Sequence, residues 1–200
     1  MQETWDVIVV GAGMAGASVG WQLAQAGQRV LVLERESQPG YHTTGRSAAL
    51  FEEHYGPAQV QALTRASRAF YEHPPAGFAD APLLSPRGVM YVATAAQKNL
   101  IDAAYSEVVK HSPDAKRLNG QALRALVPVL AEHIVDGFVD DGARDIDVHA
   151  LHQGFLRGLR QAGGALWCNA DVTALAHDAS ARQWSVTLAD GRTAHAALLV

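Results

Sequence analysis

The 200-residue chain is 48% hydrophobic and carries a formal net charge of −4, with 16 basic and 20 acidic side chains. These values exclude a disordered or fibrous protein and are typical of a chain that folds around a hydrophobic core. Lys and Arg are scattered along the sequence, so we expect no nucleic-acid partner. Cys168 is the single cysteine and cannot form an internal disulfide, which favours a reducing compartment, the cytoplasm.

Residues 7–23 are mostly apolar and could be mistaken for a signal peptide. However, the acidic Asp6 precedes them where a signal peptide has Lys or Arg, and glycines interrupt the run well short of a membrane span. The sequence therefore predicts neither a signal peptide nor a transmembrane segment.

The first 35 residues predict a β-α-β unit. Asp6–Val10 is a short run rich in valine and isoleucine, which is typical of a strand buried in a parallel sheet. Met14–Ala26 has apolar residues at helical spacing and ends at Gly27. Arg29–Leu33 predicts a second buried strand, so the connection is a right-handed crossover.

A G-x-G-x-x-G pattern lies between the first strand and the helix. Gly11 makes the tight turn, Gly13 lets a pyrophosphate approach the backbone, and Gly16 lets the helix pack on the sheet. Glu34 ends the second strand 18 residues after Gly16, where a carboxylate binds ribose hydroxyls and repels a 2′-phosphate. The pattern favours FAD or NAD over NADP. We assign to the cofactor Gly11, Gly13, Met14, Ala15, Gly16 and Glu34.

The segment after Glu34, "QPGYHTTGRSAALF", is rich in small residues that suit backbone lying against a phosphate and a flat ring. Here the sequence resembles the glycine and D-amino-acid oxidase family of flavoenzymes, and is most similar to its D-arginine dehydrogenase type. Further matching stretches are "ALTRASRAFYEHPPAGF", "PLLSPR", "VPVL" and "DIDVHALHQGFLRGLR". The resemblance extends from Gly11 to about Arg160.

The resemblance implies FAD as the cofactor. It places Glu34 on the FAD ribose with Arg35 beside it, and Val172 at a position where main-chain atoms hold the adenine. For Val172 an ordinary strand valine is the alternative interpretation. The loop expected along the pyrophosphate and flavin consists of Thr43, Thr44, Gly45, Arg46, Ser47, Ala48, Ala49 and Leu50.

Two departures from the arginine-selective type concern the substrate. That type has a histidine where this chain has Leu50, and a glutamate, able to pair with a cationic side chain, where this chain has Val89. An unpaired cation in an apolar pocket is costly, so we expect a neutral or apolar D-amino acid. Tyr55 stands where the family has a tyrosine near the substrate, and an aromatic ring packed under a loop is the alternative.

The resemblance implies an FAD-dependent oxidoreductase. A D-amino acid transfers a hydride to the flavin, and the imino acid hydrolyses to a 2-oxo acid and ammonia. Another enzyme of the glycine or sarcosine oxidase type and a non-catalytic FAD-binding half are the alternatives. The sequence identifies neither the catalytic residues nor the electron acceptor.

The expected fold class is α/β, with a Rossmann-like FAD-binding domain and inserted helices and strands that form part of a substrate domain. We expect residues 1–73 to bind FAD, residues 74–140 to be the insertion, and residues 141–200 to return to the FAD-binding domain. The resemblance also implies that a second half follows residue 200.

Within the insertion, the prolines of residues 73–87 indicate a connection, and Val89–Ala93 predicts a strand. Ala95–Lys110 and Gln121–Leu126 predict helices. Asp147 is a suitable N-cap for a further helix that ends at the glycine pair of residues 163–164. The last expected element is a hairpin with its turn at residues 190–191.

His149 and His152 lie one helical turn apart and could suggest a metal site. Carboxylates and cysteines at a recognised ligand spacing are missing from the sequence around them, so we predict no metal.

Overall fold

The computed structural model describes residues 4–200. It divides into two compact units. The first unit comprises the chain up to Ala48 together with Pro75–Ala81 and Val148–Val200, and the second comprises Ala49–Pro74 and Pro82–Asp147. Each unit is described separately below.

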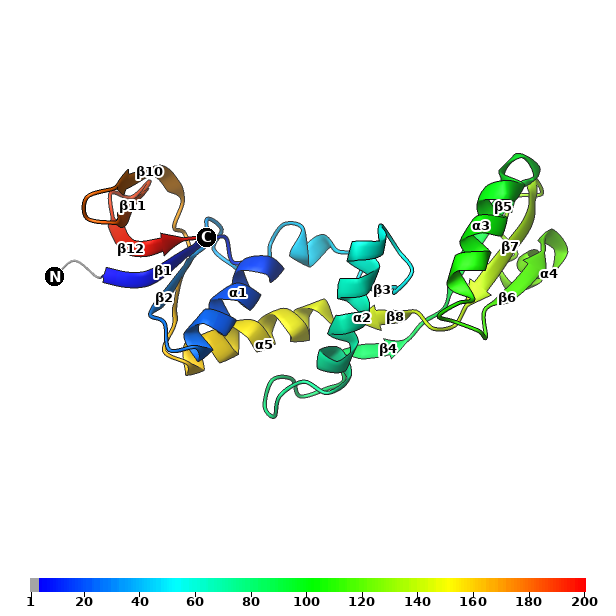
Figure 1. Ribbon diagram of the computed structural model, residues 1–200, viewed down its shortest axis with the longest axis horizontal. Helices are drawn as coiled ribbons and strands as arrows, with labels where there is room; N and C mark the ends of the chain where they lie inside the picture. The colour runs from blue at the N-terminus through cyan, green and yellow to red at the C-terminus, as the bar shows by residue number, and fades with distance from the viewer. Residues whose placement is uncertain (1–3) are drawn as a thin grey trace. The chain divides into compact units, whose positions relative to one another are not determined.

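The first unit is built on a six-stranded sheet with the order β10-β11-β12-β1-β2-β9 (Figure 1). β1 pairs in parallel with both β2 and β12, and β2 pairs in parallel with β9, whereas β10, β11 and β12 form an antiparallel meander. The strands are β1 (Thr4–Val10), β2 (Val30–Leu33), β9 (Ala165–Trp167), β10 (Val172–Asp178), β11 (Gln183–Leu188) and β12 (Thr193–Leu199).

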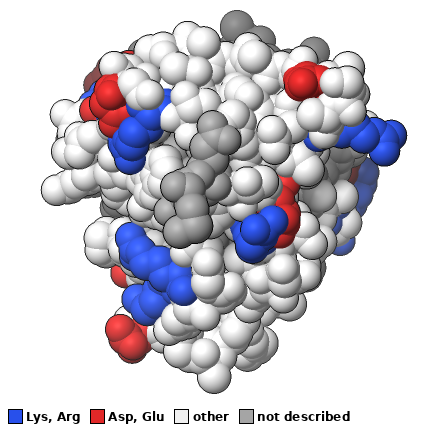
Figure 2. Space-filling view, turned by 90° about the vertical axis from the view of Figure 1, so that its left-hand side faces the viewer, with Lys and Arg blue, Asp and Glu red and all other residues white. Residues whose placement is uncertain are grey.

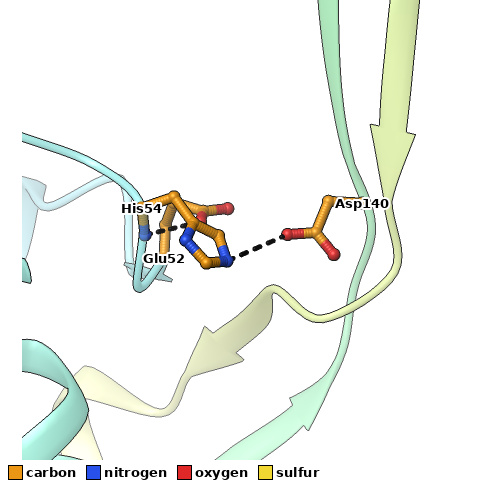
Figure 3. Close-up of side chains that lie close together, drawn as sticks. All are labelled: Glu52, His54 and Asp140. Carbon is orange, nitrogen blue, oxygen red and sulfur yellow. Dashed lines mark hydrogen bonds and ion pairs between the residues drawn. The ribbon is translucent and has the colours of Figure 1, made fainter. Parts of the chain in front are cut away.

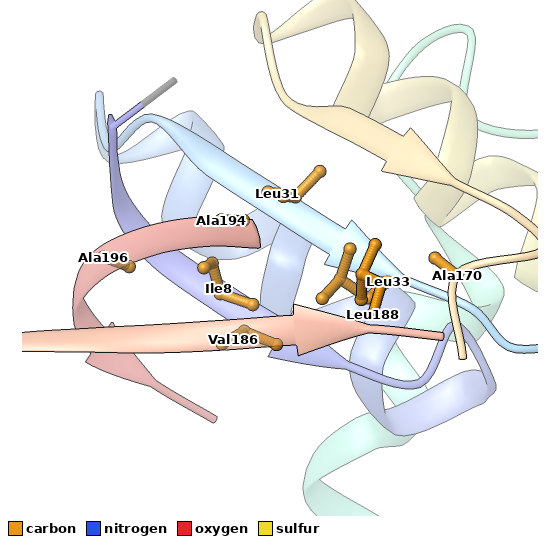
Figure 4. Packing of buried hydrophobic residues seen from close by; sticks show 8 residues of the cluster. All are labelled: Ile8, Leu31, Leu33, Ala170, Val186, Leu188, Ala194 and Ala196. Atoms are coloured by element: carbon orange, nitrogen blue, oxygen red, sulfur yellow. The ribbon is translucent and has the colours of Figure 1, made fainter. Parts of the chain in front are cut away.

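The core of this sheet lies between its parallel and antiparallel parts. Figure 4 shows Ile8, Leu31 and Leu33 from the parallel strands packed with Val186 and Leu188 from the meander. All five side chains are at most 2% exposed. Burial of these aliphatic side chains supplies the main driving force for the unit, at about 1.5–3 kcal/mol for each fully buried side chain.

Two helices, α1 (Met14–Gln25) and α5 (Val148–Gln161), pack side by side on the sheet (Figure 1). Trp21 of α1 is buried, and its ring lies 5.4 Å from that of Phe78 and 5.5 Å from that of Phe155. Gly158 of α5 lies beneath the indole, because a Cβ there would come within 2.4 Å of Trp21 Nε1. The absence of a side chain at Gly158 thus sets the close approach of the two helices.

The second unit contains two antiparallel three-stranded sheets, with the orders β3-β8-β4 and β5-β7-β6. Helix α3 packs on β5 and β7 around Phe138, which is fully buried and stacks on Tyr91 at 4.6 Å. The elements are β3 (Leu50–Phe51), α2 (Ala58–Glu72), β4 (Leu84–Pro86), β5 (Val89–Thr94), α3 (Lys98–Val108), β6 (Lys116–Asn119), α4 (Gly120–Leu126), β7 (Ile134–Asp140) and β8 (Arg144–Ile146).

The α/β fold class and the strand-helix-strand order of the N-terminus are confirmed. The turn at residues 190–191 joins β11 to β12 as predicted. The single helix predicted over Ala95–Lys110 is wrong in one respect, because residues 95–97 form a separate 3₁₀ turn before α3. Thr94 and Gln97 form a capping box that starts this turn. Helix α2 and the strands β3, β4, β6, β7 and β8 were not predicted.

Of the helices in residues 4–200, none combines the length and the apolar character needed to cross a bilayer. Figure 2 shows one face of the molecule, on which Lys and Arg side chains lie in separate groups with acidic side chains close to several of them. On this face the basic groups do not merge into a continuous patch.

Candidate functional site

A pocket of about 400 Å³ lies in the first unit, at the carboxyl ends of β1 and β2. In open α/β sheets this edge is where nucleotides bind. The residues that line the pocket are Val10, Gly11, Gly13, Leu33, Glu34, Arg35, Gly40, Tyr41, His42, Thr43, Thr44, Ala170, Asp171 and Val172.

The glycine loop between β1 and α1 can form only with glycine at two of its positions. Gly11 has a φ of +100°, which side chains rarely adopt, and its N–H donates to the Leu33 carbonyl at 2.7 Å. A Cβ on Gly16 would lie 1.8 Å from the Gly11 carbonyl oxygen. Gly13 differs, because a Cβ there would meet a single side-chain atom, Thr44 Oγ1, at 3.2 Å. Gly13 lines the pocket, so a larger side chain there would fill space beside the helix N-terminus.

Thr44 links the loop after β2 to the first turn of α1. The backbone N–H of Met14 donates to Thr44 Oγ1 at 2.9 Å. The first N–H groups of a helix have no intrahelical acceptor and carry partial positive charge. The hydroxyl uses its oxygen for Met14, so its own hydrogen is available to an anion in the pocket.

Glu34 is held in place by two backbone donors. Its Oε2 accepts from the Ala12 N–H and its Oε1 accepts from the Glu36 N–H, both at 3.0 Å. Each carboxylate oxygen can accept a second hydrogen bond. The half-buried carboxylate is therefore fixed at the pocket wall and still able to accept from a diol.

The segment before β10 forms the remaining part of the pocket wall and is hydrogen-bonded to the backbone of Glu34. The N–H of Glu34 donates to the Trp167 carbonyl, and the N–H of Ala170 donates to the Glu34 carbonyl, both at 2.8 Å. Val172 follows at the start of β10 and lines the same pocket.

At the rim, Arg35 and His42 both contact the carboxylate of Glu36, at 3.3 and 2.7 Å. The hydrogen bond from His42 lowers the pKa of Glu36.

The glycine loop, the helix N-terminus, the Thr44 hydroxyl and the Glu34 carboxylate fit the adenosine diphosphate half of a dinucleotide. The donors suit phosphate oxygens, and the fixed carboxylate suits ribose hydroxyls. The structure brings seven predicted residues into one pocket wall, namely Gly11, Gly13, Glu34, Arg35, Thr43, Thr44 and Val172. Met14, Ala15 and Gly16 form the first turn of α1 beside it, and Gly45 and Arg46 belong to the 3₁₀ turn that begins at Thr44.

The remaining predicted residues lie elsewhere. Of the residues that the structure describes, Ser47, Ala48, Ala49 and Leu50 do not line this pocket. Ala48 ends the first unit, and Leu50 starts β3 in the second. Tyr55 and Val89 also belong to the second unit; Tyr55 is 73% exposed and so is not packed under a loop, and Val89 starts β5.

His152 supports the glycine loop, a contact that sequence reasoning missed. It is buried, and its Nε2–H donates to the Ala12 carbonyl at 2.7 Å, whereas His149 is exposed. The two histidines considered as a metal pair therefore face different surroundings.

A second cluster lies in the second unit and was also missed. Glu52, His54 and Asp140 place one ligand atom each within 4.8 Å of one another (Figure 3). All three side chains are buried. Burial raises the pKa of Glu52, and burial together with the charges of Glu52 and Asp140 raises the pKa of Tyr91 to about 12.

The fold and the pocket define a dinucleotide-binding protein of the α/β class. Residues 6–200 match the family described as "DAO: FAD dependent oxidoreductase", and the chain belongs to this family. The predicted FAD cofactor is confirmed by this match.

Among curated proteins, the chain is 55% identical to FixC of Azotobacter vinelandii over 40 residues, which are 20% of this chain and 9% of FixC. Among solved structures, glycine oxidase of Geobacillus kaustophilus aligns with a TM-score of 0.82 at 19% identity, over 99% of this chain and 55% of that one. NikD, described as an unusual amino acid oxidase essential for nikkomycin biosynthesis, aligns with a TM-score of 0.84 at 25% identity, over 99% and 51%. The chain thus spans about half the length of these solved structures.

Proposed function

We propose that the protein to which this chain belongs is an FAD-dependent oxidoreductase that oxidises a small D-amino acid. The pocket formed by the glycine loop, Thr44 and Glu34 carries the proposal, since it fits the cofactor that the chemistry needs. The similarity to NikD and to glycine oxidase, both described as acting on amino acids, supports this substrate class. The resemblance to the D-arginine dehydrogenase type supports the D enantiomer.

In this proposal, the residues of this chain bind FAD and fix its orientation. Gly13 and the N–H groups at the start of α1 receive the pyrophosphate, the Thr44 hydroxyl donates to it, and Glu34 accepts from the ribose. Arg35 and Val172 complete the adenosine side of the pocket. When bound, FAD accepts a hydride from the carbon that bears the amino group, and water then converts the imino acid to a 2-oxo acid and ammonia.

We assign the wall next to the substrate side chain to Leu50, Tyr55 and Val89 of the second unit. Leu50 and Val89 are aliphatic, so this wall favours a neutral or apolar side chain over a cationic one. Asp140 is the cross-strand partner of Val89, so a buried carboxylate lies close to this position. The ranking of D-arginine against apolar substrates tests whether that carboxylate is open to the substrate.

Two further assignments belong to this proposal. Residues 1–73 and 141–200 bind FAD, and residues 74–140 contribute to the substrate domain. The single cysteine, Cys168, is partly buried, and burial raises the pKa of its thiol, which is consistent with a structural role in a reducing cytoplasm.

The test uses the full-length protein, purified and mixed anaerobically with single amino acids while the flavin absorbance is recorded. D-Leucine and D-methionine are expected to bleach the flavin, and their L enantiomers are not. Bleaching by glycine or sarcosine alone would assign the protein to that oxidase type, and bleaching by none of these would contradict the amino-acid proposal.

The control for the cofactor site is Gly13→Val. Its side chain would displace the Thr44 hydroxyl and occupy space beside the helix N-terminus, so the variant is expected to fold and purify without flavin. A yellow Gly13→Val protein with an unchanged spectrum would show that this loop does not hold the pyrophosphate.

A further inference from the structure

The cluster of Glu52, His54 and Asp140 belongs to the second unit and shares no residue with the cofactor pocket of the first. Glu52 and His54 come from the segment after β3, and Asp140 is the last residue of β7. Figure 3 shows the His54 imidazole directed toward the Asp140 carboxylate, with the Glu52 side chain beside it. The proposed function gives no role to Glu52 or His54, and it considers Asp140 only as the cross-strand neighbour of Val89.

One side-chain donor and one backbone donor fix the orientation of the Asp140 carboxylate. The Ser112 hydroxyl donates to Asp140 Oδ1 at 2.9 Å, and the Gly142 N–H donates to the same oxygen at 2.8 Å. The other oxygen, Oδ2, lies 3.6 Å from His54 Nε2. This distance is too long for a hydrogen bond and close to the separation of about 3.4 Å between two ligands on one tetrahedral ion.

Glu52 is oriented in the same way. Its Oε1 accepts from the His54 N–H at 3.0 Å, and the side chain is buried, with the residue 6% exposed. Within residues 4–200, Glu52 Oε2 is a buried oxygen without any hydrogen-bond partner, and His54 Nδ1 is a buried nitrogen without one. An unpartnered carboxylate oxygen is costly to bury, so its retention indicates a ligand.

The charge of the cluster points to a divalent cation. When both carboxylates are ionised, as metal ligands must be, the cluster has a net negative charge in a dry environment, even when the imidazole is protonated. One imidazole nitrogen with two carboxylate oxygens is a donor set for zinc or manganese, whereas magnesium prefers oxygen ligands and copper(I) prefers sulfur. We propose that Glu52, His54 and Asp140 bind a divalent transition-metal ion of the zinc type.

In this site one carboxylate oxygen each of Glu52 and Asp140 and one ring nitrogen of His54 are the ligands. These atoms lie within 4.8 Å of one another, and binding draws them closer together. Ser112 and Gly142 hold the Asp140 ligand, as outer partners commonly do at metal sites. The ion ties the segment after β3 to the end of β7 and fixes the backbone next to the exposed Tyr55.

The test uses the full-length, tag-free protein with its flavin, dialysed against a chelator and then titrated with Zn²⁺ by calorimetry. We expect one equivalent of zinc to bind and to raise Tm. Glu52→Gln is expected to weaken zinc binding by about 100-fold or more, because a neutral amide replaces a charged ligand. The matched control is Asp141→Asn, since Asp141 adjoins Asp140 but is 70% exposed and pairs with Lys116.

A second measurement separates metal binding from a purely structural role. Without metal, Glu52→Gln is expected to be at least as stable as the native protein, because it removes a carboxyl group whose charged form is disfavoured by burial and whose Oε2 has no hydrogen-bond partner. With zinc, the native protein is expected to have the higher Tm, because it binds the ion more tightly than Glu52→Gln does. Zinc binding that is equal in the native protein and in Glu52→Gln would overturn the proposal. So would a rise in Tm with D-arginine or guanidinium ion and none with zinc, which would assign the cluster to an organic cation.

The result is independent of the proposed oxidation. If an amino acid bleaches the flavin and zinc does not bind, the proposed oxidation is supported and the metal site is contradicted. If zinc binds and no amino acid bleaches the flavin, the metal site is supported and the proposed oxidation is contradicted.

Discussion

The buried Nε2–H of His152 donates to the backbone carbonyl of Ala12 at 2.7 Å, and so anchors helix α5 to the glycine loop. His152 also lies against Gly40, where a Cβ would come within 3.1 Å of its ring. One side chain thus contacts two of the backbone segments that line the cofactor pocket, the glycine loop and the segment that begins at Gly40. The conformation of the glycine loop depends on a residue far away in the sequence.

Replacing His152 by Leu is therefore expected to weaken FAD binding. The Ala12 carbonyl would be left buried without its donor, at a cost of about 1–3 kcal/mol in the free energy of unfolding. Titration of the stripped protein with FAD and thermal unfolding measure the two effects. His149→Leu, on the exposed side of the same helix, is the control. Equal effects of the two substitutions would contradict the anchoring role.

Glu34→Gln is expected to lower FAD affinity without loss of the fold. The amide keeps one acceptor for the N–H of Ala12 or Glu36 but loses the charge that strengthens hydrogen bonds to ribose. We expect a loss of about 1–3 kcal/mol in binding free energy, measured by fluorescence titration with FAD. Glu34→Ala leaves both N–H groups unpaired, so it should also lower Tm. An affinity that is unchanged in Glu34→Gln would show that the carboxylate does not contact the cofactor.

The N-terminal unit could be predicted because its signals are local. The valine-rich strand, the glycine loop and Glu34 follow one another within 35 residues, and each has one physical interpretation. Helix α2 was missed although its apolar residues gather on one face at helical spacing, and none of its residues is fully buried. The 3₁₀ turn before α3 was missed although Thr94 and Gln97 have the spacing of a capping box.

The contacts that complete the sites could not be predicted. His152 meets Ala12 across 140 positions, and Asp140 meets His54 only after β7 pairs with β5. Such contacts depend on the tertiary fold, and a single sequence has no period or motif that encodes them. His149 and His152 lie one helical turn apart, a spacing that suggests metal ligands in a sequence. The candidate metal ligands are instead Glu52, His54 and Asp140, which have no regular spacing along the chain.

In the second unit, the ion pair of Arg117 and Asp136 is expected to give pH-dependent stability. Arg117 of β6 donates two hydrogen bonds to Asp136 of β7, at 2.7 and 2.6 Å, and these lower the pKa of Asp136 from its usual 3.8. Because the folded pKa lies below the unfolded one, the stabilisation is complete above about pH 5 and disappears as the pH falls through the folded pKa.

Asp136→Asn is therefore expected to lower the free energy of unfolding by about 1 kcal/mol at pH 7, and by progressively less as the pH approaches 3. Denaturant titrations of both proteins across this range measure the difference. Asp102→Asn is the control, because the Asp102 carboxylate is 47% exposed and accepts a single hydrogen bond from Arg117. An Asp136→Asn effect that is as large at pH 3 as at pH 7 would exclude the ion pair as its cause.

Val89 offers a direct test of the substrate assignment. It is paired with Asp140 across the antiparallel strands β5 and β7, so the two side chains project from the same face of the sheet. If this face meets the substrate, Val89→Glu should raise kcat/KM for D-arginine relative to D-leucine by about 10-fold, which corresponds to about 1.4 kcal/mol. The like charge of Asp140 opposes the new carboxylate, so Tm is expected to fall.

Val92→Glu is the matched control, since Val92 lies three residues further along β5, projects from the opposite face and is 39% exposed. A kcat/KM ratio that moves equally in both variants would reflect net charge alone, and a ratio that moves in neither would place Val89 away from the substrate.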